Sequence, residues 1–291
     1  MRKRLIPAVA CLPLLALAAC DVKVGDGGMS FDVTHGRAND EWTRTYTIQK
    51  GGRLEIAAAG GPVYVTSGGP EVQVKILRQG QAASDEAAQQ VLKEETIAED
   101  VTPERVRVET KRPGSNTGAF ARRRVSTEWH VSIPAGLHVS VKGENADVTL
   151  TGVQGTFTLE NTNGGFRGAG VSGSLIATTV NGMIDVDFDA ITGDVTATTV
   201  NGPVRIGLPE SANVTLEATT VNGGVNVDDA LRFTPTLSER LKVRGQVNEG
   251  GPKVVLQTTN GPVRIGVTGQ RRGRGRRGAE PAVIERQLQE R

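Results

Sequence analysis

Three aspartates at alternating positions are the clearest candidates for chemistry in this sequence of 291 residues. Asp185, Asp187 and Asp189 would share one face of an extended strand, because successive side chains of a strand point to opposite faces. Carboxylates gathered on one face can hold a cation, as they do in carboxylate-lined enzymes of the β-helix type. Equivalent positions of neighbouring repeats hold Arg205 and Asn226 instead. A shared calcium site is therefore not expected, and an enzyme acting on polysaccharides is the weaker alternative.

The three histidines do not predict a metal site. His35 lies in a polar segment, His130 in an alternating strand and His138 beside a turn, so no two have the spacing of metal ligands. The glycines follow a repeat and are explained by bends, not by a nucleophile elbow or a phosphate-binding loop. Aromatic residues make up 3% of the chain, which disfavours a groove that stacks sugars. We predict a non-enzyme without catalytic residues, metal or cofactor.

The start of the chain contains a candidate modification site. A basic opening and an apolar run over residues 5–18 form a secretion signal that is too short to span a membrane as a mature helix. Residues 17–20 resemble the lipobox of bacterial lipoproteins, whose cysteine thiol is acylated before cleavage. We predict a signal peptide over residues 1–19, cleavage between Ala19 and Cys20, and fatty acyl chains such as palmitate on Cys20. A plain signal peptide with a chance cysteine is the alternative.

This start predicts where the protein is found. The other cysteine, Cys11, lies in the segment to be removed, so no disulfide can form within one mature chain. Two or more acyl chains hold a protein stably on a membrane. We expect a protein of the bacterial cell envelope, anchored by lipid on the periplasmic face or at the cell surface. Asp21 resembles an inner-membrane retention signal of enterobacteria, which leaves the choice of membrane open.

The end of the chain is basic, whereas the body is acidic. Residues 270–291 are predicted to be a disordered tail, because arginine interleaved with glycine cannot pack. The tail could contact an anionic surface of lipid or lipopolysaccharide, or could simply aid solubility. Export makes nucleic acid an unexpected partner. The residues proposed for anionic contact are Arg271, Arg272, Arg274, Arg276 and Arg277.

A repeat organises most of the sequence between these ends. Each copy is centred on an asparagine followed by glycine, with apolar residues six and four positions before the asparagine and two and four positions after the glycine. These turn pairs are Asn163–Gly164, Asn181–Gly182, Asn201–Gly202, Asn222–Gly223 and Asn260–Gly261. Degenerate copies lie around Asn145 and Gly60. Successive turns about 18–21 residues apart indicate a β-solenoid, an all-β fold with one coil per repeat.

An antiparallel meander is the alternative fold, because asparagine followed by glycine also favours hairpins. Stacking of like on like favours the solenoid: Thr178, Thr198 and Thr219 would stand in one column along parallel strands. The turn asparagines could form an amide ladder, and glycine would supply the positive φ of the bend. The 38 residues between Asn222 and Asn260 are close to two periods, and we interpret them as an excursion from the stack.

The remaining segments complete one elongated domain. Residues 20–40 are polar and predict a flexible tether, and residues 41–269 form the predicted solenoid domain. A short helix is expected at about residues 84–96, because Ser84 can cap it and acidic residues fill its first turn. Alternating strands precede and follow this insertion, and the turn Ile133–Gly136 leads into the regular array.

With these features the chain resembles a known family. The strand pair around the Gly60–Gly61 turn, the helical insertion, the Ile133–Gly136 turn and the repeated Thr–Val–Asn–Gly units are similar to the β-solenoid family of proposed adhesins of bacterial envelopes. The resemblance covers about residues 45–267. It implies a β-solenoid fold and an adhesin-like or scaffold role that binds a protein or glycan partner, in a family whose function is largely uncharacterised. A regulatory lipoprotein of envelope stress is the alternative function.

Overall fold

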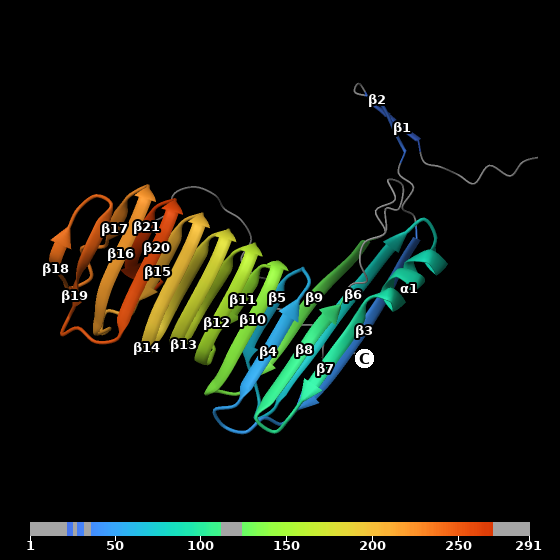
Figure 1. Ribbon diagram of the computed structural model, residues 1–291, viewed down its shortest axis with the longest axis horizontal. Helices are drawn as coiled ribbons and strands as arrows, with labels where there is room; N and C mark the ends of the chain where they lie inside the picture. The colour runs from blue at the N-terminus through green and yellow to red at the C-terminus, as the bar shows by residue number, and fades with distance from the viewer. Residues whose placement is uncertain (1–21, 26–27, 32–35, 112–123, 270–291) are drawn as a thin grey trace, which may run out of the picture.

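The computed structural model describes residues 22–25, 28–31, 36–111 and 124–269 (Figure 1). The body is a two-layered β-solenoid with one helix among the described residues. Layer 1, which faces the reader in Figure 1, contains β7 (Thr96–Val101), β8 (Arg105–Lys111), β4 (Arg53–Ala58), β10 (Leu137–Asn145), β12 (Gln154–Asn163), the second halves of β13 (Phe166–Asn181) and β14 (Ile184–Asn201), β20 (Lys253–Asn260), β16 (Val214–Asn222), β19 (Lys242–Val247) and β18 (Phe233–Ser238).

Layer 2 lies behind layer 1 and continues from it through the turns. It contains β3 (Gly36–Tyr46), β6 (Val72–Ala82), β9 (Arg124–Ile133), β5 (Val63–Ser67), β11 (Val148–Thr151), the first halves of β13 and β14, β15 (Val204–Leu208), β21 (Val263–Val267) and β17 (Val225–Val227). A coil is one strand of layer 1, a turn and the next strand of layer 2. Because β13 and β14 bend from layer 2 into layer 1, the two layers form one continuous sheet.

The core lies between the layers and is built from alternate side chains of each strand. Phe157 and Leu159, at six and four positions before a turn asparagine, are fully buried, as are Phe166 and Ile184 after the turns. One hydrophobic cluster extends through the whole stack. Burying such a side chain stabilises the fold by about 1.5–3 kcal/mol. The period of two in the sequence therefore corresponds to the buried face of each strand.

The coils of the regular array are parallel, which confirms the solenoid and excludes the meander. β10, β12, β13 and β14 pair in parallel, with Asn145, Asn163, Asn181 and Asn201 in one register. Antiparallel pairing is confined to the two ends of the stack. A hairpin turn would reverse the strand, whereas here each turn passes the chain from one layer to the other.

The turn asparagines form a continuous ladder of side-chain amides. Asn163 Nδ2 donates to Asn145 Oδ1 over 3.1 Å, and Asn181 Nδ2 donates to Asn163 Oδ1 over 2.9 Å. The next three bonds, from Asn201 to Asn181, Asn260 to Asn201 and Asn222 to Asn260, are each 2.8 Å long. The ladder predicted from the sequence is therefore confirmed.

The glycines after these asparagines are required for two reasons, of which one was expected. Gly164 and Gly261 have the positive φ that the bend was predicted to demand, 135° and 158°, whereas Gly182, Gly202 and Gly223 do not. A Cβ on Gly202 would instead lie 2.0 Å from the carbonyl oxygen of Gly182, and a Cβ on Gly182 would lie 2.0 Å from that of Gly164. Buried Thr199 completes the packing by donating to the Gly182 oxygen over 3.0 Å. Close approach of neighbouring backbones requires glycine here.

The last coil of the chain lies inside the stack rather than at its end. β20 pairs in parallel with β14 on one side and with β16 on the other. β21 lies in the same way between β15 and β17. Gln257 therefore separates Thr198 from Thr219, and the expectation that these two threonines stack directly is wrong.

The long interval before this coil is an excursion, as predicted. Residues 228–252 include β18 and β19, which extend layer 1 beyond β16 with antiparallel pairing. Leu231 and Val243 of this segment are buried against the stack. The excursion covers the layer-1 edge of the outermost coil, because β19 takes the hydrogen bonds that another coil would otherwise make.

The helical insertion is confirmed and closes the other end of the stack. Helix α1 (Asp85–Glu94) lies within the predicted range, and its N-cap Ser84 accepts a hydrogen bond from the Ala87 amide over 3.3 Å. Arg78 Nη1 donates to the carbonyl of Glu95 over 2.7 Å and so satisfies the end of the helix. Buried Ala88, Val91 and Leu92 give the helix its packed face.

The predicted tether is shorter than expected. β3 begins at Gly36 and pairs with β6 along its whole length, so residues 36–40 belong to the body. Backbone pairing with β6 supports this segment although it contains few apolar residues. Within the same predicted tether, β1 (Val22–Gly25) and β2 (Gly28–Phe31) form an antiparallel pair. The predicted signal peptide of residues 1–19 and the predicted tail of residues 270–291 lie outside the described residues.

Candidate functional site

Two of the three aspartates singled out from the sequence, Asp185 and Asp187, belong to an ion-pair cluster. Arg205 Nη1 lies 2.5 Å from Asp185 Oδ1 and 2.9 Å from Asp187 Oδ1. Burial alone would lower the pKa of Arg205, but its hydrogen bond and charge interactions with the two carboxylates outweigh burial and raise that pKa. Asp189 is exposed. Among the described residues, no group of three or more His, Cys, Asp or Glu side chains is arranged to hold a metal.

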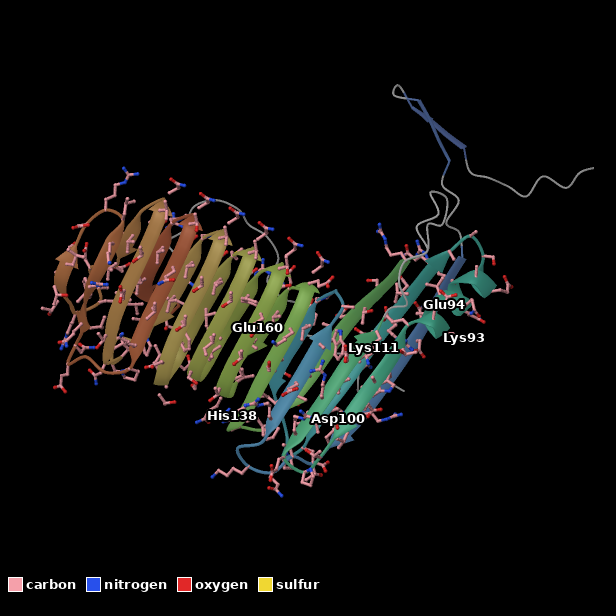
Figure 2. The ribbon with its side chains drawn as sticks, in the orientation of Figure 1. Lys93, Glu94, Asp100, Lys111, His138 and Glu160 are labelled. Carbon is pink, nitrogen blue, oxygen red and sulfur yellow. The ribbon has the colours of Figure 1, made fainter. Side chains whose placement is uncertain are left out.

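The two described histidines lie on opposite layers. His130 on β9 stacks on Tyr64 of β5, with ring centroids 5.2 Å apart, and its Nε2 lies 2.9 Å from Glu128 Oε1. His138 is at the start of β10 and lines a groove on layer 1 (Figure 2). The structure therefore does not bring these histidines together. His35 lies outside the described residues.

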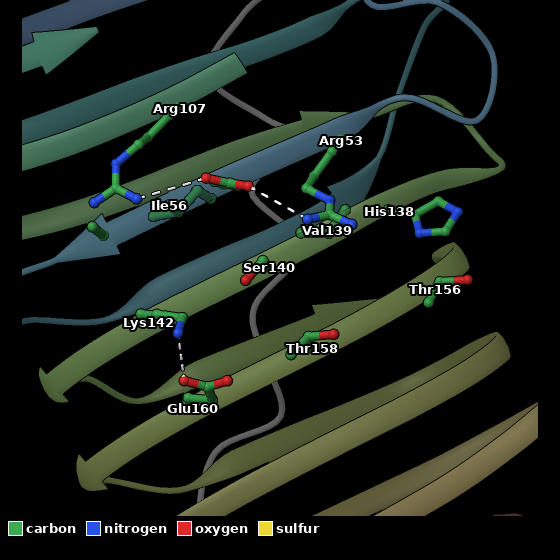
Figure 3. A pocket seen from close by; sticks show the side chains of 12 residues that line it. Arg53, Ile56, Arg107, His138, Val139, Ser140, Lys142, Thr156, Thr158 and Glu160 are labelled. Atoms are coloured by element: carbon green, nitrogen blue, oxygen red, sulfur yellow. Dashed lines mark ion pairs between the residues drawn. The ribbon is translucent and has the colours of Figure 1, made fainter. Parts of the chain in front are cut away.

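The groove beside His138 is our candidate site. It has a volume of about 390 Å³ and lies on the outer surface of β8, β4, β10 and β12 (Figure 3). Strand pairing places Arg53 beside His138, Glu55 beside Ser140, and Ala57 beside Lys142. The hollow forms because the small side chains of Ala57 and Ser140 are flanked by long charged ones.

Opposite charges face one another across the groove. The Glu55 carboxylate lies between two guanidinium groups, 3.7 Å from Arg53 Nη1 and 3.6 Å from Arg107 Nη1. On the other side, Lys142 Nζ lies 2.8 Å from Glu160 Oε2. Figure 3 shows both sets of ion pairs. The lining itself holds three permanent cations and two carboxylates, and Glu109, just outside the lining, lies 3.3 Å from Arg107 Nη2 and offsets the extra cation.

The polar groups without charge complete the lining. Ser140 of β10 and Thr158 of β12 are paired in register, and Thr156 lies in register with His138. All four side chains line the groove, and His138 is its only ring. The lining therefore offers hydroxyl groups and cations to a ligand, with no Phe, Tyr or Trp surface on which a sugar could stack.

Of the residues that line this groove, only His138 was a candidate for chemistry in the sequence. It was considered as a lone histidine, and Arg53, Arg107 and Lys142 were not candidates. Each occupies an outward position of an alternating strand, which is a signal that the sequence contains. The strands come from distant parts of the chain, and β8 lies beside β4 only because the insertion folds back on the stack. Register between these strands was needed to find the site.

The other predicted site residues fall into two groups. The turn asparagines and glycines come together in the ladder described above. Ala19 and Cys20 lie outside the described residues, as do the five tail arginines. In the part of the chain that the structure describes, no helix has the length and apolar character needed to cross a membrane.

Comparisons with known proteins give one family and several solved structures of low similarity. The model of the Toastrack DUF4097 family matches residues 22–266. A search of curated proteins gives no match. A proposed cell adhesion protein from Clostridium sporogenes is 15% identical, with a TM-score of 0.49 over 79% of this chain and 100% of that one. A proposed adhesin from Bacteroides fragilis is 10% identical, with a TM-score of 0.37 over 78% and 97% of the two chains. A proposed lipid binding protein from Parabacteroides distasonis is 8% identical, with a TM-score of 0.24 over 78% and 96%.

Proposed function

Because this chain belongs to the Toastrack DUF4097 family, a family of solenoid-like β-proteins, we propose that it is a membrane-anchored lipoprotein of the bacterial envelope whose solenoid binds a protein or glycan partner. The observation that carries the proposal is the polar groove on layer 1. A preformed concave surface with convergent polar groups is the usual form of a binding site. The body then acts as a rigid scaffold that presents this groove.

The groove is proposed to bind without catalysis. Ser140 and His138 both line it, but no hydrogen bond joins them in the described part of the chain. Each carboxylate of the groove pairs with a cation instead of orienting His138: Glu55 pairs with two arginines and Glu160 with Lys142. A nucleophile, a base and a group that orients the base are the parts that acyl transfer needs. The groove supplies polar contacts rather than that arrangement.

The anchor is proposed on the lipobox-like residues 17–20 and on the position of Cys20 at the end of a secretion signal. Feeding cells an alkyne fatty acid tests it. The native protein should become labelled and fractionate with membranes, and Cys20→Ala should remain unlabelled. Equal labelling of the two proteins would exclude Cys20 as the anchor. Protease added to intact cells then distinguishes a surface location from a periplasmic one.

Site-specific crosslinking tests the binding role. A photo-crosslinking amino acid placed at Ser140, in the groove, is compared in living cells with one at Thr198, an outward position of β14 on the same layer. Groove binding predicts a discrete crosslinked product from position 140 and little from position 198. If both positions give the same products, or neither gives any, the groove is not the binding surface.

A further inference from the structure

We propose that the groove on layer 1 binds an anionic sugar, whose charged group is held by Arg53 and Arg107 and whose hydroxyl groups are held by Ser140 and Thr158. The inference rests on the proposed binding function and names the class of ligand. It follows from how the charges of the groove are paired, where on layer 1 they lie and which neutral groups surround them.

The two arginines have hydrogen-bonding capacity that the fold leaves open. Their separations from Glu55, 3.7 and 3.6 Å, are longer than N–H···O hydrogen bonds. Arg107 Nη2 also donates to Glu109 Oε2 over 3.3 Å, which leaves the other donors of its guanidinium and those of Arg53 with only the distant Glu55. An arginine fork makes its strongest contacts as two parallel hydrogen bonds to a carboxylate or phosphate. A ligand oxyanion placed between Arg53 and Arg107 would complete such contacts.

The groove lies apart from the other charged part of layer 1, at its C-terminal end, where β16 and β19 present Glu217, Lys242 and Arg244. The outward residues of the next two strands are mostly neutral: β13 presents Ile176 and Thr178, and β14 presents Thr196 and Thr198 beside the charged Asp194. Both strands bury apolar residues, as β4 and β10 do. The solenoid therefore does not need the charges of the groove for folding. Exposed ion pairs of this kind contribute little to stability, which favours a binding role for them.

The remaining lining suits a sugar better than an apolar ligand. Ser140 and Thr158 are adjacent across the β10–β12 pair and can each donate and accept a hydrogen bond. The volume of about 390 Å³ is at the small end of ligand sites, so the groove would hold a short saccharide segment. Without a Phe, Tyr or Trp platform, neutral sugars would have only weak contacts here, and a charged group must supply most of the affinity.

Titration calorimetry on the purified full-length protein in a neutral detergent tests the proposal. The probes are trigalacturonate, its neutral methyl ester, and glucose 6-phosphate with glucose as its neutral counterpart. Binding of trigalacturonate or glucose 6-phosphate that weakens with added salt supports an anionic sugar, and the stronger of the two identifies the charged group as carboxylate or phosphate. Equal binding of charged and neutral probes, or no binding of either charged probe, overturns it.

Variants locate the binding on the protein. Replacing Arg53 and Arg107 with glutamine should weaken binding by about tenfold or more, as expected for lost charge-assisted hydrogen bonds. The matched control replaces Arg167 and Arg264, two exposed arginines of layer 2, with glutamine and so removes the same charge. The control should bind within about twofold of the native protein, because it leaves the groove intact. Equal losses in both double variants would indicate a general effect of charge and overturn the assignment.

Glu55→Gln should change the affinity for the charged probe in the opposite direction to the arginine substitutions. It removes the carboxylate that competes with the ligand for both arginines, so binding of the charged probe should become tighter. A loss of binding in Glu55→Gln would contradict the proposed geometry.

The proposed function and this inference fail in different ways. If crosslinking at Ser140 captures a partner whose binding ignores both arginine substitutions, the groove still binds but its ligand is not anionic.

Discussion

The regular array and the groove region are built on the same coil but expose different chemistry. In the array, which comprises β13, β14 and β15, most inward residues are apolar and most outward residues of layer 1 are threonine, serine or aliphatic. In the groove region, which comprises β4, β8, β10 and β12, most inward residues are equally apolar but charged side chains occupy many of the outward positions. Packing thus constrains one side of each strand and leaves the other side free to acquire a function.

Removing the last coil should produce the largest effect on this framework. Deleting residues 248–291 takes away β20 and β21. Among the strands that the structure describes, these two alone pair β16 and β17 with β14 and β15. Coils stabilise mainly their neighbours. We expect limited proteolysis to digest residues 209–247 while residues 36–208, including the groove, stay protected.

The matched deletion removes residues 270–291 alone and should leave the digestion pattern unchanged. If the longer deletion also exposes the groove region to protease, the two regions are coupled more tightly than nearest-neighbour stacking allows.

Gly202→Ala is expected to have the next largest effect, and to act on the array alone. The added Cβ would lie 2.0 Å from the Gly182 carbonyl oxygen and would force two coils apart. Overpacking of this kind destabilises by about 1–3 kcal/mol. Urea denaturation should show that loss. Gly69→Ala is the control, because a Cβ on Gly69 meets no atom within 4 Å. Comparable losses in both variants would mean that the loss at Gly202 does not come from the contact between coils.

Asn201→Ala should weaken the ladder by a smaller amount. Asn201 donates to Asn181 and accepts from Asn260, so two hydrogen bonds are lost at an exposed position. A loss of about 1 kcal/mol in the free energy of unfolding is expected. Asn226→Ala, on exposed β17 and outside the ladder, should change stability by less than about 0.5 kcal/mol. Equal stability of Asn201→Ala and the native protein would show that solvent replaces the ladder without loss.

The smallest predicted effect is a pH dependence at the C-terminal end of the stack. Arg244 donates to Glu217 Oε1 over 2.9 Å, and this hydrogen bond lowers the pKa of Glu217 below 4.5. A lowered folded-state pKa stabilises the protein above the unfolded value, and this contribution is lost as pH falls through the folded value. The protection of β19 amides from hydrogen exchange, after correction for the intrinsic pH dependence of exchange, should therefore decrease below about pH 4.5 in the native protein.

Glu217→Gln separates this pair from general acid denaturation. Exchange in β19 of this variant should be less sensitive to acid, while exchange in β12 should respond to pH as in the native protein. An unchanged acid response of β19 in Glu217→Gln would show that the ion pair is not its cause.

Much of the array could be predicted because its repeat is local. The period of two identified buried residues such as Val204 and Ile206, and the recurring asparagines identified the turns of the ladder. The helix was predictable from Ser84 and the acidic residues that follow it. The role of glycine was predicted only in part: the positive φ of Gly164 and Gly261 is a property of one residue, whereas the contact between backbones at Gly202 requires the neighbouring coil.

The groove could not be predicted in the same way. Arg107 and Glu55 are 52 residues apart in the sequence and meet because β8 folds back beside β4. Nothing in the local pattern of either strand specifies that neighbour. Thr198 and Thr219 show the converse: their sequence contexts are alike, but the inserted coil separates them.

By itself, the sequence determined what each coil buries, where it turns and why coils stack, because alternation and turn chemistry act within a few residues. Tertiary structure alone decided the order of the coils in space, and with it which outward side chains share a surface. The physical reason is that all coils present nearly equivalent edges for hydrogen bonding. Local chemistry therefore permits several neighbours for β14, and only the packing of the whole chain selects β20.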